Sequence, residues 1–171
     1  SGDNYTLDFS VDVNSERSGE ARNNGTFYGG ATINKTSYKF GGGSGEFDGT
    51  DDYINIPDSD IFTFGDGSFA DRPFSVAGWI KPDDATNMIL ASKADHITNK
   101  AEWVLEIDDG DDARWSLYDS STSNRISIEH ADLTGREGTW IHLVGTYDGS
   151  TNEEGLKLYI DGINVSTTSN S

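Results

Sequence analysis

The chain lacks cysteine, has few basic residues and contains no long apolar run, and each absence excludes a class of protein. Without cysteine, its 171 residues can form neither disulfide bonds nor thiolate metal sites. Only 12 Lys and Arg stand against 30 Asp and Glu, a formal net charge of −18, so the basic surface that neutralises nucleic-acid phosphates is missing. No stretch approaches the roughly 20 apolar residues of a membrane span. We therefore expect neither nucleic-acid binding nor membrane insertion.

The residues that are present suit a single folded domain over residues 1–171. Apolar residues make up only 33% of the chain, yet eight Phe, seven Tyr and four Trp supply large side chains for a core. A chain of this length buries roughly 70% of its unfolded surface on folding. We expect a core that needs no covalent cross-links.

The clearest structural pattern covers residues 140–165. Aromatic and β-branched residues fill 140–147, and apolar and polar residues alternate over 156–160, as in half-buried strands. Between the last two strands stands Asp161-Gly162, a pair that tolerates the two positive φ angles of a two-residue hairpin loop. The stretch predicts three strands joined by two turns.

The same period of two recurs along the chain, while apolar spacing of three and four never persists for more than two turns. An Asp48-Gly49 turn ahead of the alternating residues 53–56 predicts a further hairpin. The pattern predicts an all-β protein of two packed antiparallel sheets. Strands are expected over residues 5–13, 74–82, 88–92, 103–107, 115–118 and 125–129.

Five blocks of sequence carry a resemblance to a known family. They read FGGGSGEFDGTDDYINIP (40–57), FSVAGWIKP (74–82), ILASK (89–93), WIHLVGTYD (140–148) and LYIDG (158–162). In order and spacing they resemble the concanavalin A-like jelly roll of the laminin G or pentraxin type. The resemblance implies an antiparallel two-sheet jelly-roll sandwich. Such domains continue for two or three strands after the Asp-Gly turn, so we expect a domain excised from a larger protein, or one whose last strands follow Ser171.

Some relatives of this fold cleave β-glucans with a strand of the form Glu-x-Asp-x-x-Glu, whose carboxylates share one cleft. Glu106, Asp108 and Asp111 resemble that motif. Asp109-Gly110, however, is a turn dipeptide that ends the strand before Asp111. We expect an acidic hairpin tip and no catalytic residue.

Calcium is the cofactor that the residues favour, because hard cations take carboxylate and carbonyl oxygens from loops. In laminin G-like domains one acidic ligand comes from a loop position that Asp95 matches here, with Asn99 nearby. Asp108, Asp109 and Asp111 form a second acidic group whose mutual repulsion a cation would relieve. The alternative for all of them is a solvated acidic loop.

Glycan binding uses exposed aromatic faces beside amide and acid side chains. Trp115 and Tyr118 lie on opposite faces of one predicted strand, so one of the two is expected to face solvent and contact a ligand; core packing is the alternative.

The function that these observations favour is a noncatalytic module that binds carbohydrate or a cell-surface partner with the help of calcium. It would belong to a larger extracellular, cell-surface or virion-surface protein. One alternative is a structural or assembly module of an adhesin, tail fibre or capsid decoration without a ligand of its own. A glucanase-like glycoside hydrolase is the lesser alternative.

Overall fold

The computed structural model describes residues 24–65, 71–95, 100–119, 124–130 and 133–168, so the strand expected over 5–13 lies outside the described residues. The chain divides into two compact units after Asp60, and the described part of the first unit begins at residue 24. Strands are the main regular structure of the described residues in both units, and within the described ranges no helix is long and apolar enough to cross a membrane. Three short 3-10 helices occur among the described residues: η1 (Asp60–Phe62), η2 (Thr134–Arg136) and η3 (Glu153–Gly155).

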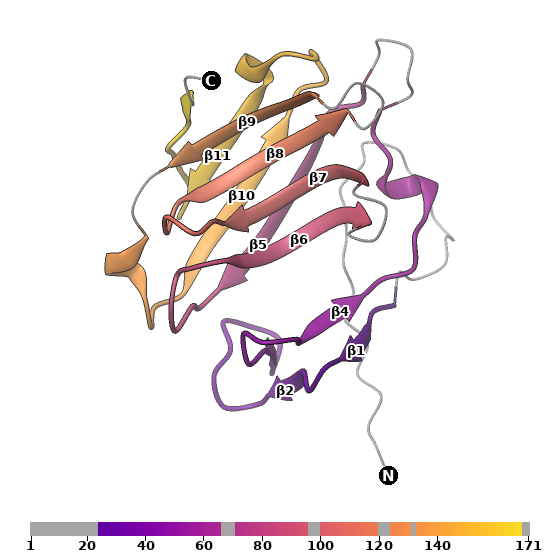
Figure 1. The fold of residues 1–171 in the computed structure, drawn as a ribbon. Helices are drawn as coiled ribbons and strands as arrows, with labels where there is room; N and C mark the ends of the chain where they lie inside the picture. Colours follow the sequence, from indigo (N-terminus) through magenta and orange to yellow (C-terminus); the bar gives the residue numbers. More distant parts are fainter. Residues whose placement is uncertain (1–23, 66–70, 96–99, 120–123, 131–132, 169–171) are drawn as a thin grey trace. The chain divides into compact units, whose positions relative to one another are not determined.

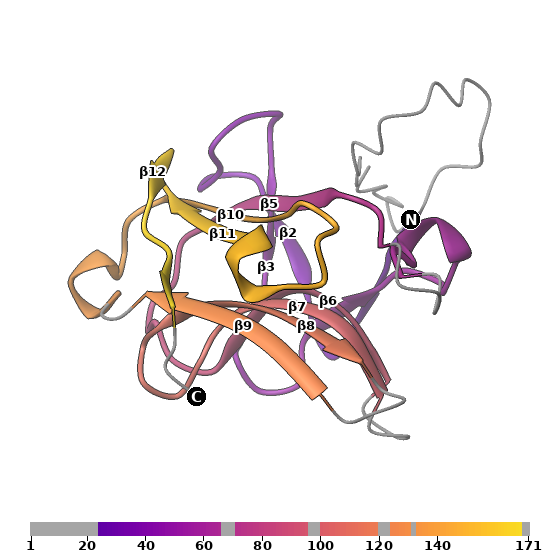
Figure 2. The same ribbon diagram turned by 90° about the horizontal axis from the view of Figure 1, so that it is seen from above.

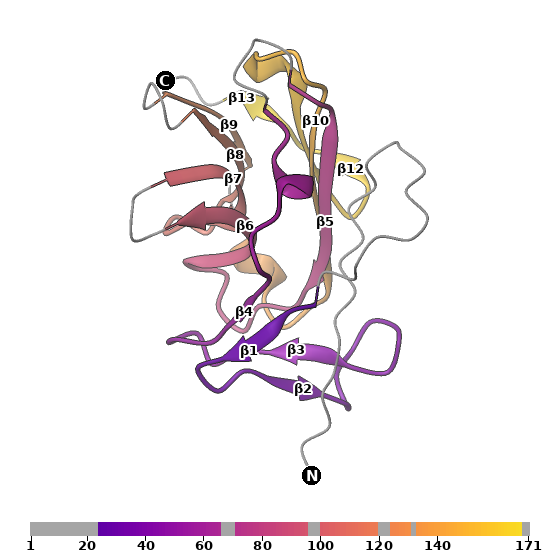
Figure 3. The same cartoon turned by 90° about the vertical axis from the view of Figure 1, so that its right-hand side faces the viewer.

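Two antiparallel sheets make up the C-terminal unit and face each other as two layers (Figures 2 and 3). The four-stranded sheet has the order β12-β11-β10-β5, with β5 (Phe74–Ile80), β10 (Ile141–Tyr147), β11 (Leu156–Ile160) and β12 (Ile163–Asn164). The five-stranded sheet, in front in Figure 1, has the order β13-β9-β8-β7-β6, with β6 (Met88–Asp95), β7 (Lys100–Ile107), β8 (Ala113–Asp119), β9 (Asn124–His130) and β13 (Thr167–Thr168). The predicted all-β, antiparallel two-sheet jelly-roll sandwich is confirmed.

The hairpin predicted at Asp161-Gly162 is confirmed. The two residues have φ angles of 51° and 81°, and Ile160 pairs with Ile163 across the turn. Asp161 also fastens the turn to β10, because its Oδ1 accepts a hydrogen bond of 2.9 Å from the backbone N–H of His142. The local sequence therefore specifies both the turn and its attachment.

Between the sheets lies a core that follows the predicted alternation. Trp115 of β8 has no exposed surface, and its indole Nε1 donates a hydrogen bond of 3.1 Å to the carbonyl oxygen of Thr146 on the opposite sheet. Gly145 makes room for this ring, because a Cβ there would lie 2.5 Å from Cδ2 of Trp115. The inward side chains of the neighbouring strands are equally buried: Leu105, Ile107, Ile141, Leu143, Leu158 and Ile160.

The described part of the N-terminal unit contains two strand pairs, one nested inside the other. β1 (Thr26–Tyr28) pairs with β4 (Tyr53–Asn55), and β2 (Thr32–Asn34) pairs with β3 (Ser44–Glu46). The hairpin predicted at Asp48-Gly49 is therefore wrong: the turn joins β3 to β4, but each of these strands pairs elsewhere. Turn residues specify the local backbone conformation, whereas the rest of the sheet determines which strand pairs with which. The prediction of one domain over 1–171 stays a prediction.

Candidate functional site

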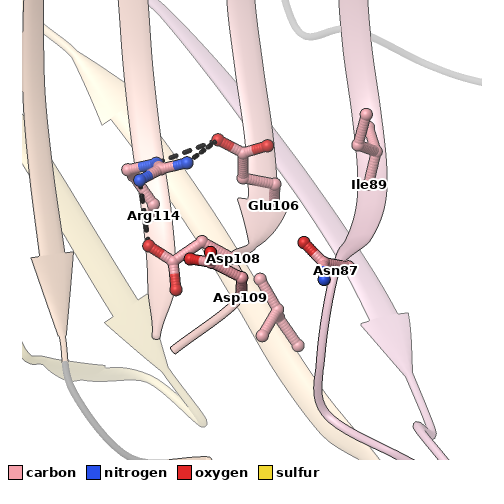
Figure 4. Close-up of a pocket in the computed structure, with 7 residues that line it drawn as sticks. Asn87, Ile89, Glu106, Asp108, Asp109 and Arg114 are labelled. Carbon is pink, nitrogen blue, oxygen red and sulfur yellow. Dashed lines mark hydrogen bonds and ion pairs between the residues drawn. The ribbon is translucent and has the colours of Figure 1, made fainter. Parts of the chain in front are cut away.

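A hollow of about 360 Å³ opens on the outer face of the five-stranded sheet, where β7 runs into the turn before β8 (Figure 4). Strand pairing assembles it, because Ile89 of β6 pairs with Glu106 of β7, which pairs with Arg114 of β8. A register shift after Ile89 keeps that side chain on the outer face, where it is 49% exposed. The hollow is lined by Asn87, Ile89, Glu106, Ile107, Asp108, Asp109 and Arg114.

Arg114 is the only cation in this lining and holds two of its carboxylates. Its Nε and Nη2 each lie 2.9 Å from Oε1 of Glu106, and its Nη1 lies 2.9 Å from Oδ2 of Asp108. Burial alone lowers the pKa of Arg114, but the hydrogen bond that Arg114 donates to Glu106 and the charges of both acids outweigh it and raise that pKa above its usual value. The guanidinium therefore stays charged, and it is paired with carboxylates of the same chain.

The turn between β7 and β8 is folded around Asp108. Oδ1 of Asp108 accepts hydrogen bonds from the backbone N–H groups of Gly110 (2.9 Å) and Asp112 (3.2 Å). The Asp108 side chain therefore holds the turn through Oδ1 and accepts a hydrogen bond from Arg114 through its other oxygen. The neighbouring Asp109 is exposed.

Asp111 points elsewhere. Its two carboxylate oxygens accept hydrogen bonds from the hydroxyl groups of Thr86 and Thr134, and these bonds, Thr86 first, lower its pKa. Its backbone has a φ of 62°, as the tip of a tight turn requires. Asp111 does not line the hollow, so the structure does not bring it together with Asp108 and Asp109 as one metal site. Nor does it gather Glu106, Asp108 and Asp111 into the single cleft that a glucanase-like hydrolase needs.

The remaining predicted site residues fall in different places. Trp115 is wholly buried and packs in the core from an inward position in β8, so it is not the solvent-facing member of the predicted pair. Tyr118 is half-buried and pairs with Arg125 of β9; its ligand role stays a prediction. Asp95 is the last residue of β6 and pairs with Lys100, whereas Asn99 lies outside the described residues, so their calcium role also stays a prediction.

Three other carboxylates meet in the N-terminal unit, in the connection between β3 and β4. Oxygens of Asp48, Asp51 and Asp52 lie within 4.8 Å of one another; we call these residues the acidic loop. Oδ1 of Asp52 is buried and has no hydrogen-bond partner among the described residues, while Oδ2 accepts a hydrogen bond of 2.8 Å from the N–H of Asp48. A buried acceptor without a donor is costly, and a hard cation such as calcium would satisfy it. At Asp48-Gly49 the sequence predicted only a turn, although three acids within five residues were a signal for a cation site.

The N-terminal unit also exposes aromatic side chains that no sequence motif singled out. Tyr28 and Tyr53, paired across β1 and β4, stack with their ring centroids 4.9 Å apart and are 45% and 53% exposed. Among the described residues, most of the exposed large apolar side chains lie in this unit: Tyr28, Tyr38, Phe40, Phe47 and Tyr53.

Comparison with known proteins agrees with this architecture. The family model Laminin_G_3, described as the concanavalin A-like lectin/glucanases superfamily, matches residues 48–171. No curated protein and no solved structure matches the chain. The match spans more than two thirds of the sequence and includes every strand of the two facing sheets. The chain belongs to the concanavalin A-like lectin/glucanases superfamily.

Proposed function

We propose that this chain is a noncatalytic carbohydrate-binding module of a larger extracellular or virion-surface protein, and that saccharide binds in the hollow beside β7. The observation that carries the proposal is the pairing of an exposed apolar side chain with hydrogen-bonding groups in one concavity. Ile89 offers an apolar surface for the C–H face of a sugar ring. Glu106, Asp109 and Asn87 border the same hollow and offer acceptors for its hydroxyl groups.

The arrangement of the acids supports binding over hydrolysis. A glycosidase needs two carboxyl groups free to act on the scissile bond, one as an acid and one as a nucleophile or base. Arg114 occupies an oxygen of Glu106 and an oxygen of Asp108, and Asp111 is bonded to threonine hydroxyls outside the hollow. These contacts position the acids as fixed parts of a surface.

Calcium enters the proposal through the acidic loop. Asp48, Asp51 and Asp52 would hold the ion, with the unpartnered Oδ1 of Asp52 as the acceptor that gains most. A bound calcium ion would supply positive charge that offsets the repulsion among the three carboxylates.

A glycan array, followed by calorimetry on the best ligand, tests the proposal. Ile89→Asn should weaken saccharide binding, because it removes the apolar surface in the hollow. Ile163→Asn is the matched control, since Ile163 is 68% exposed on β12 of the other sheet. Binding that both variants weaken equally, or an array without any saccharide ligand, would contradict the proposal.

The exposed aromatic side chains favour a second candidate, an assembly module. Exposed apolar clusters on soluble proteins mark interaction surfaces. If this surface joins copies of the chain, sedimentation velocity should show a concentration-dependent oligomer that Tyr53→Ser dissociates while saccharide binding is unchanged. A chain that stays monomeric at high concentration would contradict self-assembly.

A further inference from the structure

We propose that the hollow prefers saccharides that carry a protonated amine and discriminates against saccharides that carry carboxylate or sulfate groups. This inference rests on the proposed function, since it names the class of sugar that the same hollow would take.

The first reason is that the only cation in the lining is already engaged. Each of the three side-chain nitrogens of Arg114 lies 2.9 Å from a carboxylate oxygen of the same chain, of Glu106 or of Asp108. The side chain of Arg114 is only 23% exposed, so a ligand has little access to it. An anionic sugar would therefore have to compete with two fixed carboxylates for this guanidinium.

The second reason is that the groups left over are mostly acceptors, with the side-chain amide Nδ2 of Asn87 as the exception. In the described part of the chain, Oε2 of Glu106 accepts no hydrogen bond, and neither do the side-chain oxygens of Asp109 and Asn87. Figure 4 shows the second oxygen of Glu106 directed away from Arg114, toward the strand that carries Ile89. The ligand must therefore supply most of the donors, and hydroxyl and ammonium groups do so whereas carboxylate and sulfate groups do not.

The third reason is charge. Three carboxylates and one guanidinium border the hollow, and the whole chain has a formal net charge of −18. An ammonium group placed here gains an attraction that a neutral hydroxyl lacks, and a carboxylate meets repulsion at the same position. Because the side chain of Glu106 is only 16% exposed, solvent screens this attraction less than it screens an exposed pair.

A series of β-1,4-linked trisaccharides that share one backbone tests the inference. Cellotriose carries a hydroxyl at C2, the glucosamine trimer an ammonium group, the N-acetylglucosamine trimer a neutral amide, and the glucuronic acid trimer a carboxylate at C6. By calorimetry at pH 6 and low salt, we expect the glucosamine trimer to bind about 3- to 10-fold more tightly than cellotriose, and the glucuronic acid trimer more weakly. The preference should shrink in 0.5 M NaCl.

Two variants that each remove one negative charge separate the hollow from the net charge of the protein. Asp109→Asn should reduce the preference for the amine, because Asp109 borders the hollow. Glu154→Gln should leave it unchanged, because Glu154 is an exposed residue of η3 between β10 and β11.

The outcomes distinguish this inference from the proposed function. Equal affinities for cellotriose and the glucosamine trimer, or the tightest binding for the glucuronic acid trimer, would overturn the inference while leaving saccharide binding intact. An equal loss of preference in both variants would also overturn it, since the hollow would not be its source. If none of the four trimers binds, the inference fails, and the proposed function fails with it only if the glycan array also shows no saccharide ligand.

Discussion

Adding one methyl group at Gly145 should destabilise the protein, because the sheets meet at this glycine without spare space. An alanine Cβ there would lie 2.5, 2.8 and 2.9 Å from Cδ2, Cγ and Cε3 of Trp115. The indole cannot easily retreat, since its Nε1 is bonded to the carbonyl of Thr146 and its ring packs edge-on against Phe74 at 5.5 Å. Overpacking of this kind costs about 1–3 kcal/mol.

Urea unfolding followed by tryptophan fluorescence measures that cost, and thermal melts should show a decrease in Tm of roughly 2–12 °C. Gly135→Ala is the matched control, because a Cβ at Gly135 in η2 meets nothing within 4 Å. That variant should be neutral or slightly stabilising, by less than about 1 kcal/mol. The double variant Gly145→Ala with Trp115→Phe should lose less free energy of unfolding than the two single variants added together, because the smaller ring relieves the contact.

Unfolding of Gly145→Ala at the same urea concentration as the unmodified chain would show that Trp115 leaves room for the added methyl group. Equal destabilisation of Gly135→Ala would also refute the prediction, since the effect would then come from the loss of glycine and not from contact with Trp115.

Three further predictions concern the acidic loop and two titrating groups. Millimolar calcium should raise the Tm of the unmodified chain after chelation, and Asp52→Asn should reduce that increase; an unchanged Tm would exclude the ion from the folded state. Burial, and then the hydrogen bond to Asp71, raise the pKa of Tyr147 to about 12 from its ordinary 10.0. The stability from this shift is complete below pH 10 and is lost as the pH rises toward 12. Urea midpoints should therefore fall between pH 10 and pH 12, and Tyr147→Phe should make that fall smaller. An equal fall in the variant would show that other groups cause it. The N–H of His142, followed by Arg136, lowers the pKa of Asp161 from 3.8, which adds stability above pH 4 that is lost as the pH falls. Asp161→Asn should therefore lessen the difference between urea midpoints at pH 7 and pH 3, and an equal difference in both proteins would refute that role.

Much of the fold was predictable because the sequence patterns of strands and turns involve residues close together in the chain. Alternation located β5 through β11 to within a few residues, and Asp161-Gly162 predicted its own hairpin. The Asp48-Gly49 turn was also a correct turn, yet the strands beside it pair with β2 and β1 instead of with each other. Such pairing depends on segments distant in the sequence, which the turn residues do not encode.

The candidate site was less predictable, for the same reason. The sequence placed Glu106, Asp108, Asp109 and Asp111 together at an acidic tip, but could not show that Arg114 holds the first two or that Asp111 turns toward two threonines. These contacts join β7, β8 and the segments around them, so only the folded sheet creates them.

By itself, then, the sequence determined the all-β class, the positions of β5 through β11 along the chain and the excess of negative charge, because composition and a period of two are properties of neighbouring residues. The resemblance to the family came from five blocks of sequence in one order. The tertiary structure decided which side chains face which side. It buried Trp115 against Gly145, gathered the hollow from β6, β7 and β8, and left Oδ1 of Asp52 without a partner in the acidic loop. Those outcomes depend on register and on packing between strands that are far apart in the chain, and a linear pattern does not contain them.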